Sequence, residues 1–255
     1  MSDRRLITPF FLDRPSVPHR GLPGDWLNDL TLHDGPLVKR LSAVHDPLAA
    51  EVARTLDAGD RPVSIAGDCC AVIPVIAGLQ RAGVAPRLLW LDAHGDFNTP
   101  ETTPSGFIGG MPLAMLVGRG DLDLLRALGL TPIPERDVIL CDARDLDPGE
   151  REAVEGSEVR RVPSLAAILE QELSDRPLHV HLDVDVMSTE DAPAVLYPVA
   201  GGPRCSELVE LGRKLAARGA PVSVSMTTWV FDRDADGRTA EACTTALEGL
   251  LAKER

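Results

Sequence analysis

Two short segments of the chain place acidic and imidazole side chains on alternate residues. Asp92, His94 and Asp96 occur in the sequence WLDAHGDFN, and Asp183 and Asp185 end the sequence HVHLDVD. Because alternate residues of an extended chain share a face, each set is expected to point to one side. Carboxylates and imidazoles in this spacing suit Mn²⁺, Fe²⁺ or Zn²⁺. Taken singly, each segment also fits a polar loop or a strand end that reaches water.

The two segments together predict a metal centre. In the first segment, Asp92 directly follows the apolar run 87–91, and in the second, Asp183 directly follows the apolar run 178–182. Both runs are typical of a buried strand. Four carboxylates at one edge of a sheet would repel one another in a low dielectric unless a cation were present, and a histidine beside them adds a further metal ligand. We therefore expect these side chains to bind divalent metal.

A third segment, AGDCC, carries a cysteine that has two interpretations. It follows the apolar run 62–66, and Gly67 is expected to allow a sharp turn from strand to helix. A thiolate at Cys69 could ligate a metal. Cysteine near a helix start is equally often a small buried hydrophobe, and the sequence leaves both interpretations open.

The elements that must position these residues alternate between strands and helices, which predicts a three-layer α/β/α fold with a mainly parallel sheet in one domain over residues 1–255. Polar residues at the carboxyl ends of such strands form the usual site. The stretch Arg14–Gly24, rich in Pro and Gly, is expected to wrap the surface. The predicted strands are Leu6–Phe10, Pro62–Ala66, Arg87–Leu91, Val138–Cys141, Glu158–Val162, Leu178–Leu182 and Val222–Met226. The predicted helices are Pro47–Asp57, Ala71–Ala82, Met111–Val117, Leu122–Leu128, Gly149–Glu155, Ser164–Leu173, Cys205–Arg218 and Thr239–Lys253.

The composition narrows the class of partner. A formal net charge of −13 argues against nucleic acid and against an anionic membrane surface. Five cysteines without regular spacing do not form a disulfide framework. The chain has neither a signal-peptide pattern at its start nor about 18 consecutive apolar residues. These features predict a cytoplasmic protein that acts on a small molecule.

The three segments, in this order, resemble the motifs of the ureohydrolase family, which includes arginase, agmatinase, guanidinobutyrase and formiminoglutamase. Further similarity lies in the sequences DFNTPETTPSG, GMPLA and DRDADGRTA, and the resemblance extends from Pro62 to the C-terminus. It implies an arginase-like fold and two divalent metals, usually Mn²⁺, that share a hydroxide which attacks a guanidinium-type carbon. It also implies a homo-oligomer, a trimer or a hexamer.

The resemblance assigns a role to each predicted ligand. Asp92 and Asp183 would bridge the two metals, Asp96 would complete one metal site, and His94 and Asp185 would complete the other. Asp92, His94 and Asp183 would act catalytically through the shared hydroxide. If Cys69 ligates, its softer thiolate favours Zn²⁺ or Fe²⁺. If it does not, its site keeps three carboxylates and is expected to be weakly occupied, which leaves one firm metal. A protein with no metal is the remaining alternative.

The chain departs from the family pattern at four positions. Cys69 stands where the GGDH motif has its histidine ligand, and Gly109 stands where the SGNxHG loop has its catalytic histidine. Ser188 replaces the third acid of DxDxxDP, and Thr228 replaces the glutamate that pairs with a substrate guanidinium. Phe107 also replaces the asparagine of that loop, which makes the mouth of the site more apolar.

These departures predict an altered substrate. Without the glutamate, a buried guanidinium loses a charge-assisted partner worth about 1.5–3 kcal/mol. Without the loop histidine, general acid–base help of about 10²–10⁴-fold is lost. We therefore expect hydrolysis of a C–N bond in an amidine, guanidino, ureido or amide compound other than arginine or agmatine. The alternative is a non-catalytic arginase-fold scaffold or ligand-binding protein. The expected substrate-binding residues are Asn98, Ser105, Phe107 and Thr228.

Three further polar residues could approach the site. His181 lies on the same strand face as Asp183 and could orient a ligand carboxylate, but a packed histidine with its polar end bonded is the favoured interpretation. Asp145 and Asp147 follow a predicted strand, and a solvated loop that enters a helix is the favoured interpretation for them.

Overall fold

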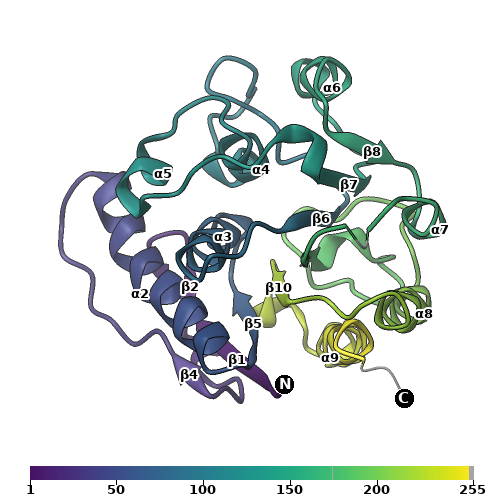
Figure 1. Cartoon of the computed structure of the whole chain (residues 1–255), viewed down its shortest axis with the longest axis horizontal. Coiled ribbons are helices and arrows are strands. Elements are labelled where there is room, and N and C mark those ends of the chain that lie inside the picture. The colour runs from purple at the N-terminus through teal and green to yellow at the C-terminus, as the bar shows by residue number, and fades with distance from the viewer. Residues whose placement is uncertain (174, 253–255) are drawn as a thin grey trace.

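The computed structural model describes residues 1–173 and 175–252 and has an eight-stranded sheet at its centre (Figure 1). The strand order is β4-β1-β5-β10-β9-β6-β7-β8, and all neighbouring strands are parallel. Two short strands, β2 and β3, pair separately and antiparallel. The strands are β1 Asp3–Thr8, β2 Phe10–Phe11, β3 Arg14–Pro15, β4 Trp26–Leu27, β5 Arg61–Ala66, β6 Arg87–Asp92, β7 Val138–Asp142, β8 Arg160–Val162, β9 Leu178–Asp183 and β10 Ser223–Thr227.

Helices cover both faces of the sheet, in two groups that lie on opposite sides in Figure 1. Helices α2 to α5 belong to one apolar cluster and α7 to α9 to the other. The predicted three-layer α/β/α architecture is therefore confirmed. The helices are α1 Val17–Arg20, α2 Leu37–Asp57, α3 Val72–Arg81, α4 Pro112–Leu116, α5 Asp123–Leu128, α6 Pro148–Glu155, α7 Leu165–Ile168, α8 Cys205–Ala216 and α9 Arg238–Leu250. The short 3-10 turns are η1 Cys69–Ala71, η2 Ile108–Gly110, η3 Glu135–Asp137, η4 Val184–Val186 and η5 Phe231–Arg233.

Burial on both faces explains why the strand sequences lack a polar alternation. In β6, Leu88 and Trp90 pack in the cluster with α2 to α5, whereas Leu89 and Leu91 pack in the cluster with α7 to α9. A parallel sheet covered on both sides requires apolar residues at successive positions. Within the described ranges, no helix combines the length and the apolar character that crossing a membrane requires.

The largest differences between the element boundaries and the sequence predictions lie at three places. Helix α2 begins at Leu37, ten residues before the predicted start, because Pro47 is accommodated inside the helix instead of opening it. Helix α7 ends at Ile168 and is shorter than predicted. The predicted strand Leu6–Phe10 is divided between β1 and β2. The predicted end of the last helix, Lys253, lies outside the described residues.

Gly67 brings the turn after β5 against the second strand. Its amide donates a hydrogen bond to the Phe10 carbonyl oxygen at 3.0 Å, and an added Cβ would lie 2.4 Å from that oxygen. Gly67 does not adopt a positive φ, so the glycine is required for close approach and not for the turn conformation that the sequence suggested. This contact fixes the start of η1, where Cys69 lies.

Gly67→Ala is expected to destabilise the protein by about 1–3 kcal/mol, because the new methyl group can be accommodated only by a backbone shift. Chemical denaturation monitored by circular dichroism measures this difference. Gly21→Ala is the matched control, since its Cβ would approach nothing closer than 3.5 Å. Equal stabilities of the two variants would show that the close approach at Gly67 is unimportant.

Candidate metal centre

Four neighbouring strands deliver the candidate site at their carboxyl ends. Strands β5, β10, β9 and β6 are consecutive in the sheet. Asp92 ends β6 and Asp183 ends β9, while Cys69 follows β5 in η1 and Thr228 follows β10. Because the strands are parallel and in register, these side chains meet at one edge of the sheet.

The first group of potential ligands contains Asp92, His94 and Asp185, whose ligand atoms all lie within 4.8 Å of one another. His94 Nδ1 lies 3.1 Å from Asp185 Oδ2 and 3.5 Å from Asp92 Oδ1. Asp92 Oδ2 accepts a hydrogen bond from Trp90 Nε1 at 2.9 Å, which orients the carboxylate. The structure thus brings together three residues that the sequence predicted as ligands.

The second group contains Cys69, Asp92, His181 and Asp183, again within 4.8 Å. The Cys69 thiol is buried and donates a hydrogen bond to Asp183 Oδ2 at 2.8 Å. Asp183 Oδ1 accepts from the Asp185 amide at 2.8 Å and from the Thr228 hydroxyl. The Cys69 sulfur contacts Asp183 while its side chain also packs in the apolar cluster with α2 to α5, so both interpretations of Cys69 stay open.

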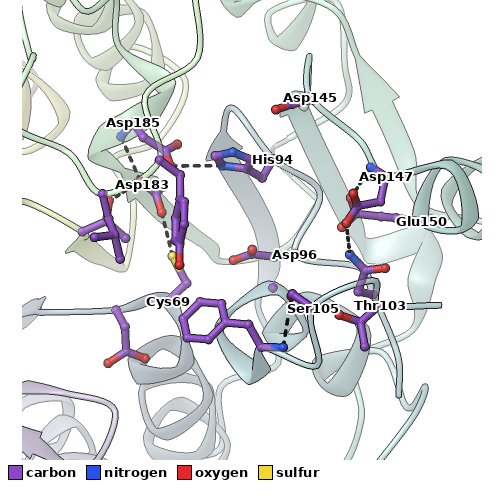
Figure 2. Close-up of a pocket in the computed structure, with 18 of the residues that line it drawn as sticks. Cys69, His94, Asp96, Thr103, Ser105, Asp145, Asp147, Glu150, Asp183 and Asp185 are labelled. Atoms are coloured by element: carbon purple, nitrogen blue, oxygen red, sulfur yellow. Dashed lines mark hydrogen bonds and ion pairs between the residues drawn. The ribbon is translucent and has the colours of Figure 1, made fainter. Parts of the chain in front are cut away.

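Asp96 belongs to neither group but lines the same cavity as Cys69 and Asp183. It is buried, and its Oδ2 has no hydrogen-bond partner among the described residues. An unpartnered carboxylate oxygen in this setting is costly unless it meets a cation or a proton. Figure 2 shows its carboxylate pointing into the space between His94 and Cys69.

The site carries an excess of negative charge. Burial and the neighbouring Asp185 raise the pKa of Asp92 to about 7. Burial and the charges of Asp92 and Asp183 raise the pKa of Asp96 well above its usual range. Burial lowers the pKa of His94, but its hydrogen bonds to Asp185 and Asp92 outweigh burial and raise the pKa to about 12. Burial and mutual repulsion both penalise the ionised carboxylates, and a bound cation would relieve both effects.

The cavity over this site fits a cationic group. It has a volume of about 210 Å³, and among the described residues seven carboxylates line it but no lysine or arginine does. The donor atoms are oxygens, an imidazole and a thiol, which are ligands for divalent transition metals. The unpartnered Oδ2 of Asp96 needs a cation or a proton, and no lysine or arginine among the described lining residues supplies one. The residues present therefore fit the divalent metals that the resemblance implies. The seven carboxylates are Asp68, Asp96, Asp145, Asp147, Glu150, Asp183 and Asp185.

The loop after β7 contributes one wall of the cavity and is also a solvated loop that enters a helix, since Asp145 is exposed and Asp147 is the N-cap of α6. Asp145 and Asp147 line the cavity together with Glu150. Asp147 accepts a hydrogen bond from Asn98 Nδ2 at 3.0 Å, and Asp147 and Glu150 form a capping box at the start of α6. Their alternate spacing was a signal in the sequence, but only the pairing of β7 with β6 brings them to the site.

An aromatic wall lies on another side of the cavity. Phe107 stacks on Phe11 with ring centroids 6.2 Å apart and lies 6.0 Å from the Tyr197 ring. A Cβ at Gly109 would lie 2.3 Å from the Phe107 ring, so the ring occupies the space that a side chain at position 109 would need. The losses of the loop asparagine and of the loop histidine are therefore physically coupled.

The remaining predicted substrate-binding residues also reach the cavity. Asn98, Ser105 and Thr228 line it, as does Thr103, which the sequence did not single out. Ser105 Oγ accepts a hydrogen bond from the Phe107 amide at 3.2 Å and supports the aromatic wall. Phe11 and Tyr197 carried no signal in the sequence, because each lies far from the three motifs along the chain.

Comparison with known proteins agrees with this geometry. Residues 14–252 match the family model of the arginase family. The Bacillus subtilis arginase is 31% identical over 233 residues, which are 85% of this chain and 78% of that protein. An N(omega)-hydroxy-L-arginine amidinohydrolase of Streptomyces lavendulae is 33% identical over 68% of this chain and 64% of that protein.

A solved structure extends the likeness to the whole fold. The crystal structure of arginase from Bacillus subtilis superimposes with a TM-score of 0.86 at 27% identity and covers 100% of this chain and 99% of that chain. The resemblance inferred from the three motifs, and the arginase-like fold that it implied, are confirmed. The chain belongs to the arginase family.

Proposed function

We propose that the protein is a metal-dependent hydrolase that cleaves a C–N bond in a small molecule of the amidine, guanidino, ureido or amide type, other than arginine or agmatine. The observation that carries this proposal is the convergence of seven carboxylates and His94 on one cavity that, among the described residues, no lysine or arginine lines. Membership of the arginase family supports it. We further propose that Asp92, Asp183, Asp96, His94 and Asp185 hold two divalent ions.

The residues divide the chemistry between them. Two divalent cations held at this edge of the sheet would lower the pKa of a bound water and stabilise negative charge that develops on the substrate. Asp183 is held by the amide of Asp185 and the hydroxyl of Thr228, so its carboxylate is oriented before any ligand binds. His94 lines the cavity and bonds to Asp185, which supports a role for its imidazole beside the reacting group.

The walls of the cavity indicate the shape of the substrate. Asp145, Asp147 and Glu150 offer oxygens to an amine or another hydrogen-bond donor at one end. The aromatic wall at Phe107 offers apolar contact. Thr228, whose hydroxyl already donates to Asp183, supplies no charge to a guanidinium. The pocket therefore favours a substrate with a donor group at one end and a reacting carbon that is less strongly cationic than that of arginine.

A hydrolysis panel tests this function. The metal-loaded protein is expected to release ammonia, urea or amine from one of a set of guanidino, ureido, formimino and amide compounds, with arginine and agmatine included. Asp183→Ala is expected to abolish both metal binding and turnover, because it removes a buried carboxylate that the proposal assigns as a metal ligand. Asp46→Ala, which breaks an exposed ion pair with Arg81, is the matched control and should leave turnover unchanged.

The panel separates the alternatives. If arginine is hydrolysed faster than every other compound of the panel, the proposal that arginine is not the substrate is wrong, but the proposed hydrolase activity still holds. Metal binding without turnover of any compound would instead support a ligand-binding scaffold. Unchanged activity in Asp183→Ala would contradict the dinuclear site.

Restoring the loop histidine is expected to work only when Phe107 is also replaced. Gly109→His alone should not increase kcat, because the Phe107 ring occupies the space that the new side chain needs. The double variant Phe107→Asn, Gly109→His should raise kcat on the best panel substrate. The increase should approach the factor of about 10²–10⁴ that a positioned general acid supplies. Steady-state kinetics of both variants and of Phe107→Asn make the comparison. Equal kcat values for Gly109→His and the double variant would refute the coupling.

A further inference from the structure

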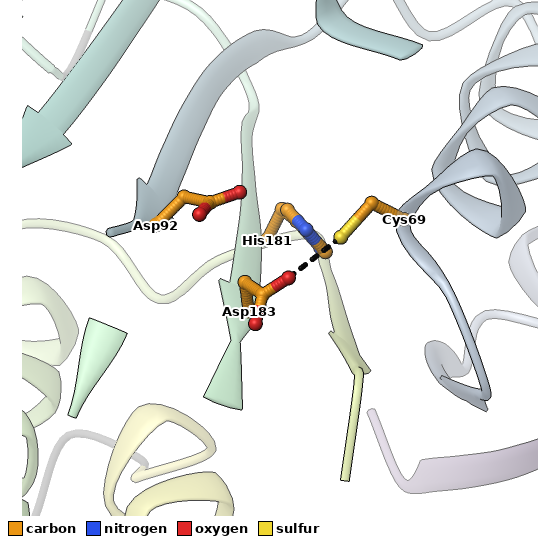
Figure 3. A group of neighbouring side chains, drawn as sticks. All are labelled: Cys69, Asp92, His181 and Asp183. Atoms are coloured by element: carbon orange, nitrogen blue, oxygen red, sulfur yellow. Dashed lines mark hydrogen bonds between the residues drawn. The ribbon is translucent and has the colours of Figure 1, made fainter. Parts of the chain in front are cut away.

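His181 has a free nitrogen at the metal centre. Its side chain is fully buried in β9, and its Nε2 has no hydrogen-bond partner among the described residues. The sequence favours a packed histidine with its polar end bonded, but only one of the two ring nitrogens has a hydrogen-bond partner among the described residues. In Figure 3 the imidazole lies between Asp92, Asp183 and Cys69. A buried imidazole nitrogen without a partner, on a ring that lies among two carboxylates and a thiol, requires an explanation beyond packing.

A hydrogen-bonded chain behind His181 holds the ring in place. Its Nδ1 lies 3.0 Å from Ser225 Oγ, and the same hydroxyl lies 3.1 Å from His179 Nε2. His179 Nδ1 in turn lies 2.7 Å from Ser223 Oγ. The Trp90 ring packs against His181 at a centroid distance of 4.1 Å, which further restricts rotation.

One tautomer of this chain leaves no buried N–H group without a partner. If His181 carries its proton on Nδ1, it donates to Ser225, whose hydroxyl donates to His179 Nε2, and His179 Nδ1–H donates to Ser223. His181 Nε2 then presents a lone pair to the acidic residues. The opposite tautomer would aim an unbonded N–H into the site at the cost of a buried unsatisfied donor. Metal-ligating histidines are commonly fixed in this way through their second nitrogen.

We infer that His181 Nε2, Cys69 Sγ and the carboxylates of Asp92 and Asp183 form a four-ligand site that selects Zn²⁺ over Mn²⁺. One ligand atom from each of the four residues lies within 4.8 Å of the others, close enough to surround one ion after small side-chain adjustments. The set of one sulfur, one nitrogen and two oxygens suits the tetrahedral preference of zinc. The imidazole that the family pattern places at position 69 is thus supplied by β9 from the opposite side of the site.

This assignment makes the two metals unequal. Four protein ligands fill the coordination of a tetrahedral ion, as in structural zinc sites. The neighbouring group of Asp92, His94 and Asp185 offers three, which leaves a position for water or substrate. The inference rests on the metal centre of the proposed function but needs no turnover for its test.

Cobalt absorption tests the assignment directly. Metal-free protein is titrated with Co²⁺, which reports a thiolate ligand through near-ultraviolet charge transfer and tetrahedral geometry through visible absorption. Both absorption signals are expected in the wild-type protein. They should disappear when Zn²⁺ displaces the bound Co²⁺ and should persist when equimolar Mn²⁺ is added. Cys69→Ser should lose the charge-transfer band, whereas the matched variant Cys70→Ser should keep it, since Cys70 belongs to neither ligand group.

Histidine variants test the relocated imidazole. Loss of a group that only orients a metal ligand weakens metal binding by about 10–100-fold, and Ser225→Ala should weaken Zn²⁺ binding within this range. His181→Ala should weaken Zn²⁺ binding by more than this, because it removes a ligand. His45→Ala is the control, because His45 is also buried with an unpartnered Nδ1 but belongs to neither ligand group. Cys69→His should shift the preference towards Mn²⁺. If His181→Ala unfolds, the Ser225→Ala titration still decides the question.

The outcomes separate this inference from the proposed function. A wild-type Co²⁺ complex without a thiolate band, or unchanged Zn²⁺ affinity in both His181→Ala and Ser225→Ala, would overturn the four-ligand site even if the enzyme turns over with Mn²⁺. A thiolate band with tight Zn²⁺ binding would support the site even if no compound of the panel is hydrolysed.

Discussion

Repulsion among buried carboxylates at the carboxyl edge of the sheet is the constraint on which the other features of the site depend. Asp92, Asp96 and Asp183 are all buried, and each has its pKa raised by burial and by neighbouring acids. Among the described residues that line the cavity, His94 is the only basic side chain. A fold that concentrates charge in this way is stable at neutral pH only when cations or protons compensate it.

The backbone around the site is shaped to serve the same cluster. Asp96, Asp142, Ala143 and Thr228 adopt positive φ values of 48°, 74°, 47° and 72°, a region that costs a residue with a side chain about 1–3 kcal/mol. For the β-branched Thr228 the conformation is especially unfavourable. It aims the hydroxyl at Asp183, so the strain contributes to holding a candidate ligand in position.

Much of the site was predictable because its information is local. The alternate spacing of Asp92, His94 and Asp96, and of Asp183 and Asp185, follows from the pleat of two strands, and the structure brings these side chains to one cavity or to its floor. The runs of apolar residues likewise predicted a sheet covered on both faces, and the motifs identified the family.

Other features depend on contacts between distant segments and could not be read from the sequence. The wall formed by Asp145 and Asp147 requires that β7 pair with β6, which no local pattern specifies. The free nitrogen of His181 depends on Ser225 of β10, 44 residues away. Phe11 reaches the cavity only because Gly67 allows the first strands to approach the turn after β5.

The central claim is that this carboxylate edge holds two divalent ions in unlike sites. Anomalous diffraction from crystals grown with Zn²⁺ and Mn²⁺ together, recorded at each metal's absorption edge, tests it most directly. The account predicts two peaks about 3.5–4 Å apart, as in other two-metal sites, with zinc beside Cys69 and His181. Folded protein without a peak at this edge would contradict the account, and so would manganese in the position between Cys69 and His181.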